Sequence, residues 1–518
     1  MNLSLLLNTV KYLRARQIFY QIKKRFINPK FKEILCSTDI RHIELRTIIN
    51  KPNCLLDDKF TFLNIDSEFI SWNDTEKGML WAYNLNYMDY LNQKDISYNE
   101  GKRWINKFID DLLNNKIGLD PYPIALRGIN WIKFISKHKN EIGQGTLTRW
   151  NNSLYSQYCL LSKKLEYHLL GNHLLEDAYS LFMAAIYFED KSLFKKASNL
   201  LLKELKEEIL ADGAHYEQSP MYHCILLDRL LDCYNISRNN KRFAEQDAIN
   251  TQLAKYASLM LGHLESIIYS DKTIPLLNDS AYGIAPEPIE IFEYANVLEL
   301  NWESIPLKEC GYRKFKNDNI EAIIDVGNIA SSYQPGHTHS DVFNYELRIN
   351  DISTIIDIGI STYNKTERRQ YERSTVAHNT VSVDNKDMHE VWGGFRVGKR
   401  AKVKIIEELK NSIKASHNGY GDKYIHTRTF SLIDDGLSIT DEITNNANAV
   451  SYIHLSPETV ILSTTKNEII TNNFTIEIEG ATDINIIDDF TSKEYNKFEP
   501  IKVVSIKFEK NLHYKITR

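Results

Sequence analysis

"SLFKKASNLLLKELKEEIL", residues 192–210, and "STIIDIGIST", residues 353–362, represent two different patterns in one chain. In the first stretch, apolar residues recur every three or four positions, which is the spacing of an amphipathic helix. In the second, apolar and polar residues partly alternate over a short run that is rich in Ile and Thr, which is typical of a strand. The two stretches therefore predict a helical half and a β half.

The helical pattern runs from about residue 76 to residue 300. It recurs in the segments 76–91, 124–138, 174–190 and 222–236. Loops that contain Gly and Pro, such as "GLDPYP" and "LADG", separate these segments. A long series of helices with short links favours stacked antiparallel pairs, as in a helical toroid or solenoid.

The strand pattern begins after about residue 310. Short runs such as "EAIIDVGNIA", "NTVSVD" and "GLSITDEI" are rich in Ile, Val and Thr, and turn residues separate them. This spacing is typical of antiparallel sheets in a β-sandwich.

Composition limits the classes of function. The 518 residues are 43% hydrophobic and 25% charged, as in a globular protein with sizeable cores. A formal net charge of −5 argues against a broad nucleic-acid-binding surface, so we expect no nucleic acid partner. The cysteines are scattered without a C-x-x-C pair, which favours reduced thiols over a disulfide framework.

The N-terminal segment 1–26 places its basic residues after a short apolar stretch, which is not the order of a signal peptide. No run of 18 apolar residues is present, so we expect no transmembrane segment. We expect a cytoplasmic location, with contact between the basic N-terminus and an anionic membrane surface as an option. The alternative is a helix that packs on its own domain with a solvated charged face.

Two groups of polar residues lie in the helical half. In "YHLLGNHLLEDAYSL", Asn172 could cap a helix on which His173 and Glu176 lie one turn apart. An N-cap beside a surface pair is an equally simple interpretation. In "LADGAHYEQSPMYH", Tyr216 and Tyr222 stand near the start of the next helix, where half-buried aromatic residues with satisfied hydroxyls would look the same.

A third group lies in "QPGHTHSDVFNYEL", residues 334–347. In an extended chain His337 and His339 point to the same side. Together with Asp357 and His378 they could form a zinc site, because two His and one carboxylate are a common ligand set. Ordinary polar residues at a sheet edge are the alternative.

Basic residues gather in "YNKTERRQYERST" and "FRVGKRAKVK". On an otherwise acidic protein, this local charge fits an anionic ligand. A solvated charged face would have the same sequence.

Several motifs, in this order, resemble the heparinase II/III-like family of polysaccharide lyases. They are "GNHLLED", "DGAHYEQSPMYH", "HTHSDVFNYEL" and "RRQYERSTVAHNTVSVD", supported by "NLNYMDYL", "YPIALRGINWIKF" and "IHTRTFSLIDDGLSITDEI". The resemblance implies an N-terminal (α/α) toroid followed by a C-terminal antiparallel β-sandwich. We accordingly expect a helical extension over 1–60, the toroid over 61–305 and the β-sandwich over 306–518.

The resemblance also implies cleavage of an acidic, uronate-containing glycan by β-elimination. Asn172, with His173 beside it, is similar to the residue that neutralises the uronate carboxylate. Tyr222 resembles the tyrosine that acts as base and acid, with Tyr216 as the second choice, and His337 resembles the partner base.

Further roles are expected on the same ground. The residues expected to bind substrate are Arg127, Glu176, Tyr216, Arg369 and Arg373. A structural zinc ion, the one cofactor expected, would be held by His339, Asp357 and His378. Family members that digest polysaccharides are usually exported, whereas the N-terminal segment of this chain does not have the order of a signal peptide. We therefore also expect that this chain could act in capsule or O-antigen metabolism.

Other functions fit parts of the pattern. A glycoside hydrolase would need two carboxylates, for which Glu176, Asp212 and Glu217 are available, but it would leave the paired histidines unexplained. A zinc hydrolase that uses His337 and His339 would place this pair early in a β/α barrel, not after a long helical region. A glycan-binding or assembly protein without turnover would keep the fold, and a Tyr222→Phe substitution would hardly affect it.

Overall fold

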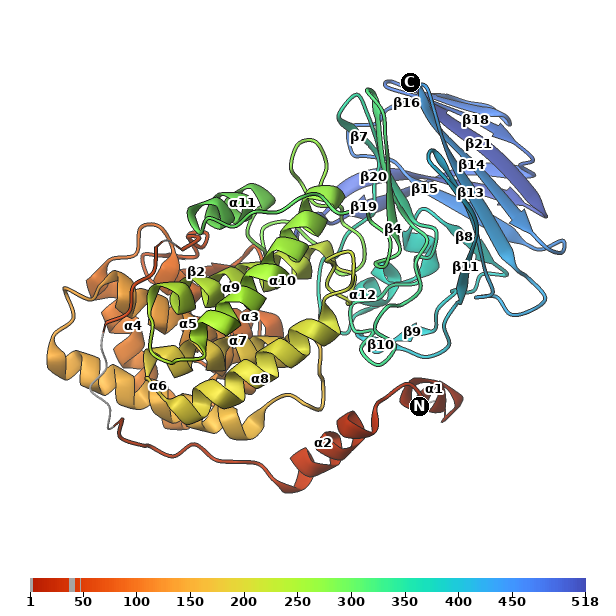
Figure 1. Cartoon of the computed structure of the whole chain (residues 1–518). Helices are drawn as coiled ribbons and strands as arrows, with labels where there is room; N and C mark the ends of the chain where they lie inside the picture. The colour runs from red at the N-terminus through yellow and green to blue at the C-terminus, as the bar shows by residue number, and fades with distance from the viewer. Residues whose placement is uncertain (1–2, 37–41, 47) are drawn as a thin grey trace.

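The protein is described by a computed structural model that covers residues 3–36, 42–46 and 48–518 (Figure 1). Figure 1 shows a helical half that contains most of the first 300 residues, followed by a half built mainly of strands. The order of the two halves is the order that the change of periodicity predicts.

Nine α-helices of the described residues lie in the helical half. They are α3 (Met79–Tyr87), α4 (Tyr98–Asp111), α5 (Pro121–Lys137), α6 (Gln144–Lys164), α7 (Asn172–Tyr187), α8 (Lys191–Glu208), α9 (Pro220–Asn239), α10 (Gln246–Ile267) and α11 (Pro288–Val297). Short 3-10 turns η1 (Asp89–Asn92), η2 (Leu112–Asn114) and η3 (Ile117–Leu119) link the earlier ones.

Local sequence explains where these helices begin. The carboxylate of Asp190 accepts a hydrogen bond from the backbone of Leu193 and caps α8. The hydroxyl of Ser219 does the same for Tyr222 at the start of α9, where Pro220 occupies the first helical position.

Helix α7 lies in the middle of this half. Nearly all of its residues are buried, and it packs against α5, α8 and α9. One hydrophobic cluster extends through the helices and includes large aromatic side chains such as Trp81, Trp131 and Trp150. The residue that begins α7, Asn172, is therefore fixed by a helix with little freedom to move.

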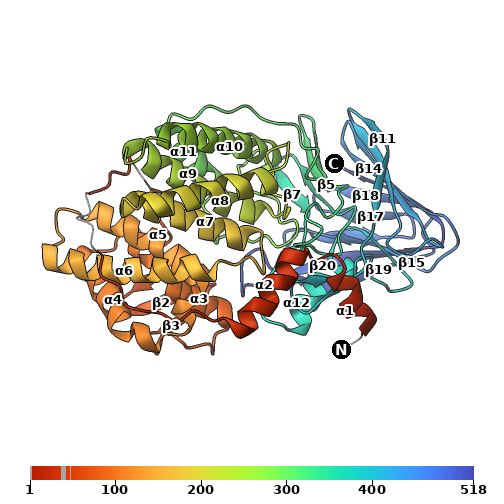
Figure 2. The ribbon, with the colours of Figure 1, turned by 60° about the horizontal axis from the view of Figure 1, so that its bottom comes forward.

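The N-terminal segment crosses the outside of both halves. Helices α1 (Leu3–Val10) and α2 (Ala15–Phe26) run beside the β half and the helical half in turn (Figures 1 and 2). Strands β1 (Leu55–Leu56), β2 (Lys59–Phe62) and β3 (Ile65–Glu68) then form a small antiparallel sheet. The helical part of the expected extension is thus limited to α1 and α2, and the small sheet extends across residue 60.

The β half contains three larger sheets. Their strands are β4 (Tyr312–Lys316), β5 (Ile320–Asp325), β6 (Tyr345–Ile349), β7 (Ile352–Ile355), β8 (Val381–Val383), β11 (Val403–Leu409), β12 (Ser412–His417), β13 (His426–Ile433), β14 (Gly436–Ile443), β15 (Ala449–His454), β16 (Ile461–Thr464), β17 (Glu468–Thr471), β18 (Thr475–Glu479), β19 (Asp483–Thr491), β20 (Glu499–Phe508) and β21 (Asn511–Thr517). The short strands β9 (Val391–Trp392) and β10 (Arg396–Val397) form a hairpin, and α12 (Glu367–Glu372) and the turn η4 (Thr375–Ala377) precede β8.

The strand orders are simple. The eight-stranded sheet has the order β11-β12-β13-β14-β21-β18-β17-β16, and the four-stranded sheets have the orders β19-β20-β15-β8 and β4-β5-β6-β7. Neighbouring strands in these sheets are antiparallel wherever the structure describes them. One hydrophobic cluster, which includes Tyr345, Phe430 and Val504, joins all three sheets.

The change from helices to strands falls between α11 and β4. Helix α11 ends at Val297 and β4 begins at Tyr312, on either side of the expected division after residue 305. Within the described residues, no helix has both the length and the apolar character needed to cross a membrane.

Candidate active site

Segments from both halves meet around Asn172, Tyr222 and His337. Asn172 is the first residue of α7, and Tyr222 lies in the first turn of α9. His337 and His339 lie in the segment between β5 and β6. Although this segment is a turn at His337 and not a strand, both imidazoles reach the same partner, as the H-x-H spacing predicts.

That shared partner is Asp279. One carboxylate oxygen lies 2.9 Å from Nδ1 of His337, and the other lies 2.8 Å from Nε2 of His339. The guanidinium of Arg369 donates to both oxygens, at 2.5 and 2.7 Å. Burial alone would raise the pKa of Asp279, but Arg369 and the two histidine hydrogen bonds hold this pKa well below its ordinary value. Asp279 is therefore a buried anion that fixes both histidines.

The hydrogen bond to Asp279 also defines the state of His337. We assign the proton on Nδ1 to the bond with the Asp279 carboxylate, which leaves Nε2 as the acceptor in the neutral ring. Nε2 lies 3.3 Å from the side-chain amide of Asn172 and 3.2 Å from a carboxylate oxygen of Glu217.

Glu217 also orients Asn172. Its two oxygens accept hydrogen bonds from the backbone nitrogen of Asn172, at 2.9 Å, and from the side-chain amide, at 2.8 Å. The chain reaches Asn172 through Gly171, whose φ of +61° is in the region that favours glycine. A Cβ atom at Gly171 would lie 2.1 Å from Glu217 and 2.9 Å from Gln334. The glycine therefore allows two loops to approach closely at this point.

Tyr222 packs on the imidazole of His337. The ring centroids are 3.9 Å apart, and the Tyr222 hydroxyl accepts a hydrogen bond from Tyr363 at 3.4 Å. Burial raises the pKa of Tyr222, Asp279 and Glu217 raise it further, and Tyr363 and Arg369 oppose this only in part. The positive charge of Arg369 therefore does not lower the pKa of Tyr222 enough to make it a base in the free protein. The phenol is protonated at neutral pH.

His173 lies beside this group and has a different partner. Its Nδ1 is 2.9 Å from a carboxylate oxygen of Glu166, and its ring packs against Tyr122 at 4.7 Å. Burial opposes the charged form, but Glu166 outweighs it and raises the pKa of His173. The side chain is 32% exposed, so His173 can present a cation to a ligand.

The residues predicted to bind substrate lie elsewhere than expected. Arg127 is fully buried and donates to Gln157 and to backbone carbonyls, and burial lowers its pKa to about 9. Glu176 is also buried, 3.7 Å from Arg229. Tyr216 is buried and receives a hydrogen bond from Tyr333 at 3.4 Å. In the structure these side chains make their contacts inside the helical half, and a direct contact with substrate stays a prediction.

The two predicted arginines of the β half are buried as well. Arg369 is only 1% exposed, and both ends of its guanidinium are held by Asp279. Arg373 is fully buried and donates to the backbone carbonyl of Thr338, next to His337. Both residues support the histidine segment, and their direct contact with an acidic chain stays a prediction.

The predicted zinc ligands are neighbours. His378 donates through Nδ1 to Asp357 at 2.7 Å, and the rings of His339 and His378 are 5.2 Å apart. Nδ1 of His339 and Nε2 of His378 are buried and have no hydrogen-bond partner. Such nitrogen atoms fit a metal ion, since zinc accepts imidazole donors of either kind. Both oxygens of Asp357 already accept hydrogen bonds, from Asn344, His378 and Gly359, so it supports His378 in the way that carboxylates support ligating histidines.

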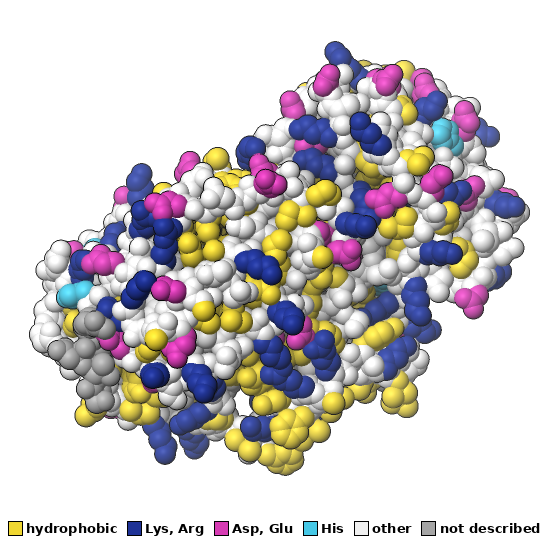
Figure 3. All heavy atoms as spheres, in the orientation of Figure 1, with side chains coloured by type: hydrophobic (Ala, Val, Ile, Leu, Met, Phe, Trp, Pro, Cys, Tyr) yellow, Lys and Arg dark blue, Asp and Glu magenta, His cyan; other side chains and the backbone are white. Residues whose placement is uncertain are grey.

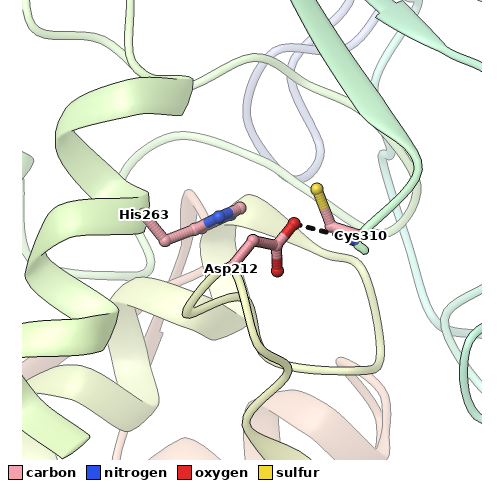
Figure 4. Close-up of side chains that lie close together, drawn as sticks. All are labelled: Asp212, His263 and Cys310. Atoms are coloured by element: carbon pink, nitrogen blue, oxygen red, sulfur yellow. Dashed lines mark hydrogen bonds between the residues drawn. The ribbon is translucent and has the colours of Figure 1, made fainter. Parts of the chain in front are cut away.

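A different group has the tightest ligand geometry. Asp212, His263 and Cys310 are buried, and their candidate ligand atoms lie within 4.8 Å of one another; among the described residues no other His, Cys, Asp and Glu group of this kind is found (Figure 4). One carboxylate oxygen of Asp212 already accepts hydrogen bonds from the backbone nitrogen atoms of Lys308, at 3.0 Å, and of Cys310, at 2.8 Å. Burial raises the pKa of the Cys310 thiol well above its ordinary value. The group therefore ties the turn after α8 to the segment that enters β4.

Sequence reasoning missed three residues of the site. Asp279 stands in "LLNDSAYG", where a lone carboxylate in a loop gives no spacing signal. Tyr363 and Phe395 pack edge to face at 5.0 Å beside His337, and Phe395 is partly exposed. Tyr363 and Phe395 lie within the two segments that the sequence marks by their basic charge. It is their aromatic rings, however, that lie beside His337.

Two family models match the chain. The heparinase II/III N-terminus matches residues 127–296, and the heparinase II/III-like C-terminal model matches residues 299–517. The chain belongs to the heparinase II/III-like family. Together these matches cover both halves and all the residues of the candidate site.

Curated relatives are distant. Heparin-sulfate lyase from Pedobacter heparinus is 24% identical over 274 residues, which are 47% of this chain and 40% of that protein. Heparin-sulfate lyase from Bacteroides stercoris is 22% identical over 308 residues, which are 52% and 44% of the two chains. The matched region thus spans less than half the length of these relatives.

Solved structures share the fold over nearly the whole chain. Heparan sulfate lyase HepC from Pedobacter heparinus has a TM-score of 0.60 at 18% identity and covers 97% of this chain and 87% of its own. A structure described as heparinase III has a TM-score of 0.67 at 14% identity and covers 97% and 91%. These structures, like this protein, combine a helical part with sheets.

Proposed function

We propose that the protein is a polysaccharide lyase that cleaves an acidic, uronate-containing glycan by β-elimination. The observation that carries this proposal is the grouping of an amide donor, an imidazole and a phenol. The amide of Asn172 lies 3.3 Å from Nε2 of His337, and the ring of Tyr222 lies 3.9 Å from the same imidazole. Family membership supports the same activity.

The reaction asks three things of these residues. The amide of Asn172 donates a hydrogen bond to the uronate carboxylate and stabilises the negative charge that develops when the C5 proton leaves. A base takes that proton, and an acid gives a proton to the O4 atom as it departs. The C5–H and C4–O4 bonds break, a C4–C5 double bond forms, and no water is consumed.

The electrostatics of the site suggest which residue does what. Tyr222 has a raised pKa and a proton to give, so it is the acid that serves O4. His337 has an acceptor at Nε2, with Asp279 behind its Nδ1 and Glu217 beside it, so it is the base for a C5 proton on its side of the sugar. For a C5 proton on the opposite ring face, Tyr222 would serve as both base and acid. This requires that the bound substrate lowers the pKa of Tyr222.

The substrate class follows from what the site offers. The raised pKa of His173 favours the charged form of its imidazole, which can meet a carboxylate or sulfate group. The aromatic faces of Tyr363 and Phe395 beside His337 provide apolar surfaces of the kind on which sugar rings stack. We propose a surface polysaccharide or its precursor as the glycan, and a cytoplasmic location stays a prediction.

We further propose that His339 and His378 hold a structural zinc ion, supported by Asp357. The support is their pair of buried nitrogen atoms without partners. When bound, zinc would keep the histidine segment in register, and no step of the elimination depends on it. Metal analysis that found no zinc in the purified protein would contradict this part of the proposal.

The architecture has a proposed finer form as well. We infer that the helices close into an (α/α) toroid and that the sheets pack as a β-sandwich. The central position of α7 among α5, α8 and α9 supports the first, and the hydrophobic cluster shared by the sheets supports the second.

The experiment is ultraviolet absorbance during incubation with a panel of uronate-containing polysaccharides, run beside the Tyr222→Phe variant. β-Elimination creates a conjugated double bond that absorbs ultraviolet light, and hydrolysis does not. We expect absorbance to rise with at least one glycan and the rate to fall at least 100-fold in Tyr222→Phe, because one acid–base group contributes about 10²–10⁴-fold. Binding of that glycan to the variant should persist.

Two results would contradict the lyase. New reducing ends without absorbance would indicate a glycoside hydrolase that uses paired carboxylates. Tight binding of an acidic glycan without cleavage, unchanged in Tyr222→Phe, would indicate a binding or assembly protein on the same fold.

A further inference from the structure

Helices α1 and α2 leave an apolar face uncovered. In α2, Ile18, Phe19, Ile22 and Phe26 fall within an arc of about 100° at 3.6 residues per turn. Phe19 is 60% exposed and Phe26 is 83% exposed. Large apolar side chains held in water at such density on one helix face usually have a partner.

Helix α1 continues this face. Leu3, Leu7 and Val10, spaced by four and three positions, are all exposed on one side. Figure 3 shows hydrophobic side chains along the lower edge of the molecule, where Figure 1 places α1 and α2, with Lys and Arg beside them. We call the exposed apolar residues of these two helices the N-terminal apolar face; they are Leu3, Leu7, Val10, Ile18, Phe19, Ile22 and Phe26.

The other sides of both helices already have partners within the protein. Asn8 donates to Glu390, and Thr9 accepts from the indole of Trp392. In α2, the amide of Gln17 is only 2% exposed and donates to the carbonyls of Leu169 and Tyr333, each at 3.1 Å. Because the polar sides are fixed in this way, the helices cannot rotate to bury the apolar face without breaking these bonds.

Charge identifies the kind of partner. The first 32 residues contain no Asp or Glu, although the whole chain has a net charge of −5. On the α2 wheel, Lys23 and Arg25 lie at the two edges of the apolar arc, and both are exposed. An apolar face bordered by cations fits the headgroup region of an anionic bilayer, where apolar side chains enter and Lys and Arg meet lipid phosphates.

We propose that α1 and α2 form a docking surface for an anionic membrane. The helices lie in the plane of the interface and do not cross it, which agrees with their short length. Since Gln17 is bonded to the loops that lead to Asn172 and His337, docking sets the candidate active site beside the membrane. This second statement rests on the proposed function, whereas membrane binding itself does not.

The test is co-sedimentation of the full chain with lipid vesicles in the absence of any glycan. Vesicles of phosphatidylcholine alone are compared with vesicles that also contain phosphatidylglycerol. We expect the protein to sediment with the anionic vesicles and to remain in solution with the neutral ones. Binding should weaken steeply as salt is raised from 0.1 to 0.5 M, roughly the range in which screening shortens below 10 Å.

Matched variants locate the surface. Phe19→Glu with Phe26→Glu, and separately Lys23→Glu with Arg25→Glu, should each reduce the vesicle-bound fraction at least tenfold. The controls are Leu113→Glu, at a leucine that is 80% exposed on η2, and Lys466→Glu with Lys510→Glu in the β half. These controls should bind like the unchanged protein, and circular dichroism should show that all variants are folded.

Three outcomes would overturn the proposal. The unchanged protein could fail to sediment with either vesicle type, or the variants of α2 could bind as well as the controls. In the third, the protein would form a dimer that Phe19→Glu with Phe26→Glu abolishes, without binding vesicles, and the apolar face would then be an interface with a second copy. If the protein cleaves free glycan but does not bind vesicles, the result contradicts membrane docking and leaves the proposed lyase function intact.

Discussion

At position 217 a buried carboxylate accepts hydrogen bonds from both nitrogen atoms of Asn172. The same carboxylate is 3.2 Å from Nε2 of His337. An amide can present an N–H to a substrate carboxylate only if its rotation is fixed, because its oxygen would otherwise repel the same group. Glu217 is thus a positioning residue for Asn172.

We predict that Glu217→Gln lowers kcat about tenfold or more and changes KM little. Each Asn172 nitrogen donates to a different oxygen of Glu217, and glutamine replaces one of these oxygens with an NH2 group, so one of the two Asn172 donors would face another donor. The measurement is steady-state kinetics in a double-mutant cycle with Asn172→Ala. If Glu217 acts through Asn172, its substitution should cost much less in the Asn172→Ala background. Fully additive losses would contradict this role.

The residues of the site differ in how far sequence predicts them. Asn172, Tyr222 and His337 stand in ordered motifs, and the structure brings all three together. Asp279 joins His337 from a loop 58 positions away, and no local pattern marks such a contact. Arg369 and Arg373 are evident as charged residues in the sequence. Only the fold reveals that both side chains are buried and bonded to groups inside the protein.

Among the elements, the turn into α7 combines a positive φ with close packing. Gly171 has a φ of +61°, and a Cβ atom there would meet Glu217 and Gln334 at less than 3 Å. These two neighbours belong to segments from the helical half and the β half. The turn is therefore a place where a single methyl group would collide with side chains from both halves.

We predict that Gly171→Ala destabilises the protein by about 1–3 kcal/mol, the usual cost of a strained backbone conformation. It should also reduce activity, because Asn172 would shift. The control is Gly336→Ala, whose Cβ would meet nothing closer than 3.9 Å and whose φ is not positive. The measurements are thermal unfolding and activity of both variants. Equal effects at the two positions would contradict the steric clash at Gly171.

Periodicity predicts elements better than it predicts their ends. The stretch 192–210 is observed as α8, Lys191–Glu208, because its apolar residues match the helix repeat and Asp190 caps it. The segment 76–91 is observed as α3 only as far as Tyr87, since Met88 adopts a left-handed conformation with φ of 57°. A turn of this kind depends on tertiary contacts, which a helical repeat does not encode.

At the scale of the whole molecule, a buried ion pair joins the sheets. Arg428 on β13 donates to both oxygens of Asp441 on β14, at 2.6 and 2.8 Å. The same guanidinium donates to the carbonyls of Phe343 and Asn379, which lie next to β6 and β8. Burial opposes the charge of Asp441, but Arg428 and His426 lower its pKa to about 2.

We predict that acid weakens the β half as Asp441 takes up a proton. Its folded pKa lies below the ordinary value of 3.8, so the stabilisation is complete above pH 3.8 and is lost as pH falls through about 2. The shift corresponds to about 2 kcal/mol. Urea unfolding followed by circular dichroism between pH 5 and pH 2 measures this loss.

Asp435→Asn serves as the control, since this residue lies in the exposed turn between β13 and β14. Its pH profile should match that of the unchanged protein. Asp441→Asn should be less stable at neutral pH, because Arg428 would keep a buried charge without its partner. A flat profile in the unchanged protein between pH 4 and pH 2 would contradict the role of Asp441.

Strand β21 pairs with β14 on one side and β18 on the other, so it fills the middle of the eight-stranded sheet. During synthesis, β14 and β18 are made before it and have no neighbour at those edges. Open edges of this kind attract other strands, including those of nascent copies on the same messenger. The helical half can fold while the ribosome is still working, but the larger sheet has to wait for residues 511–517. Chaperone demand during translation should accordingly be concentrated in the β half.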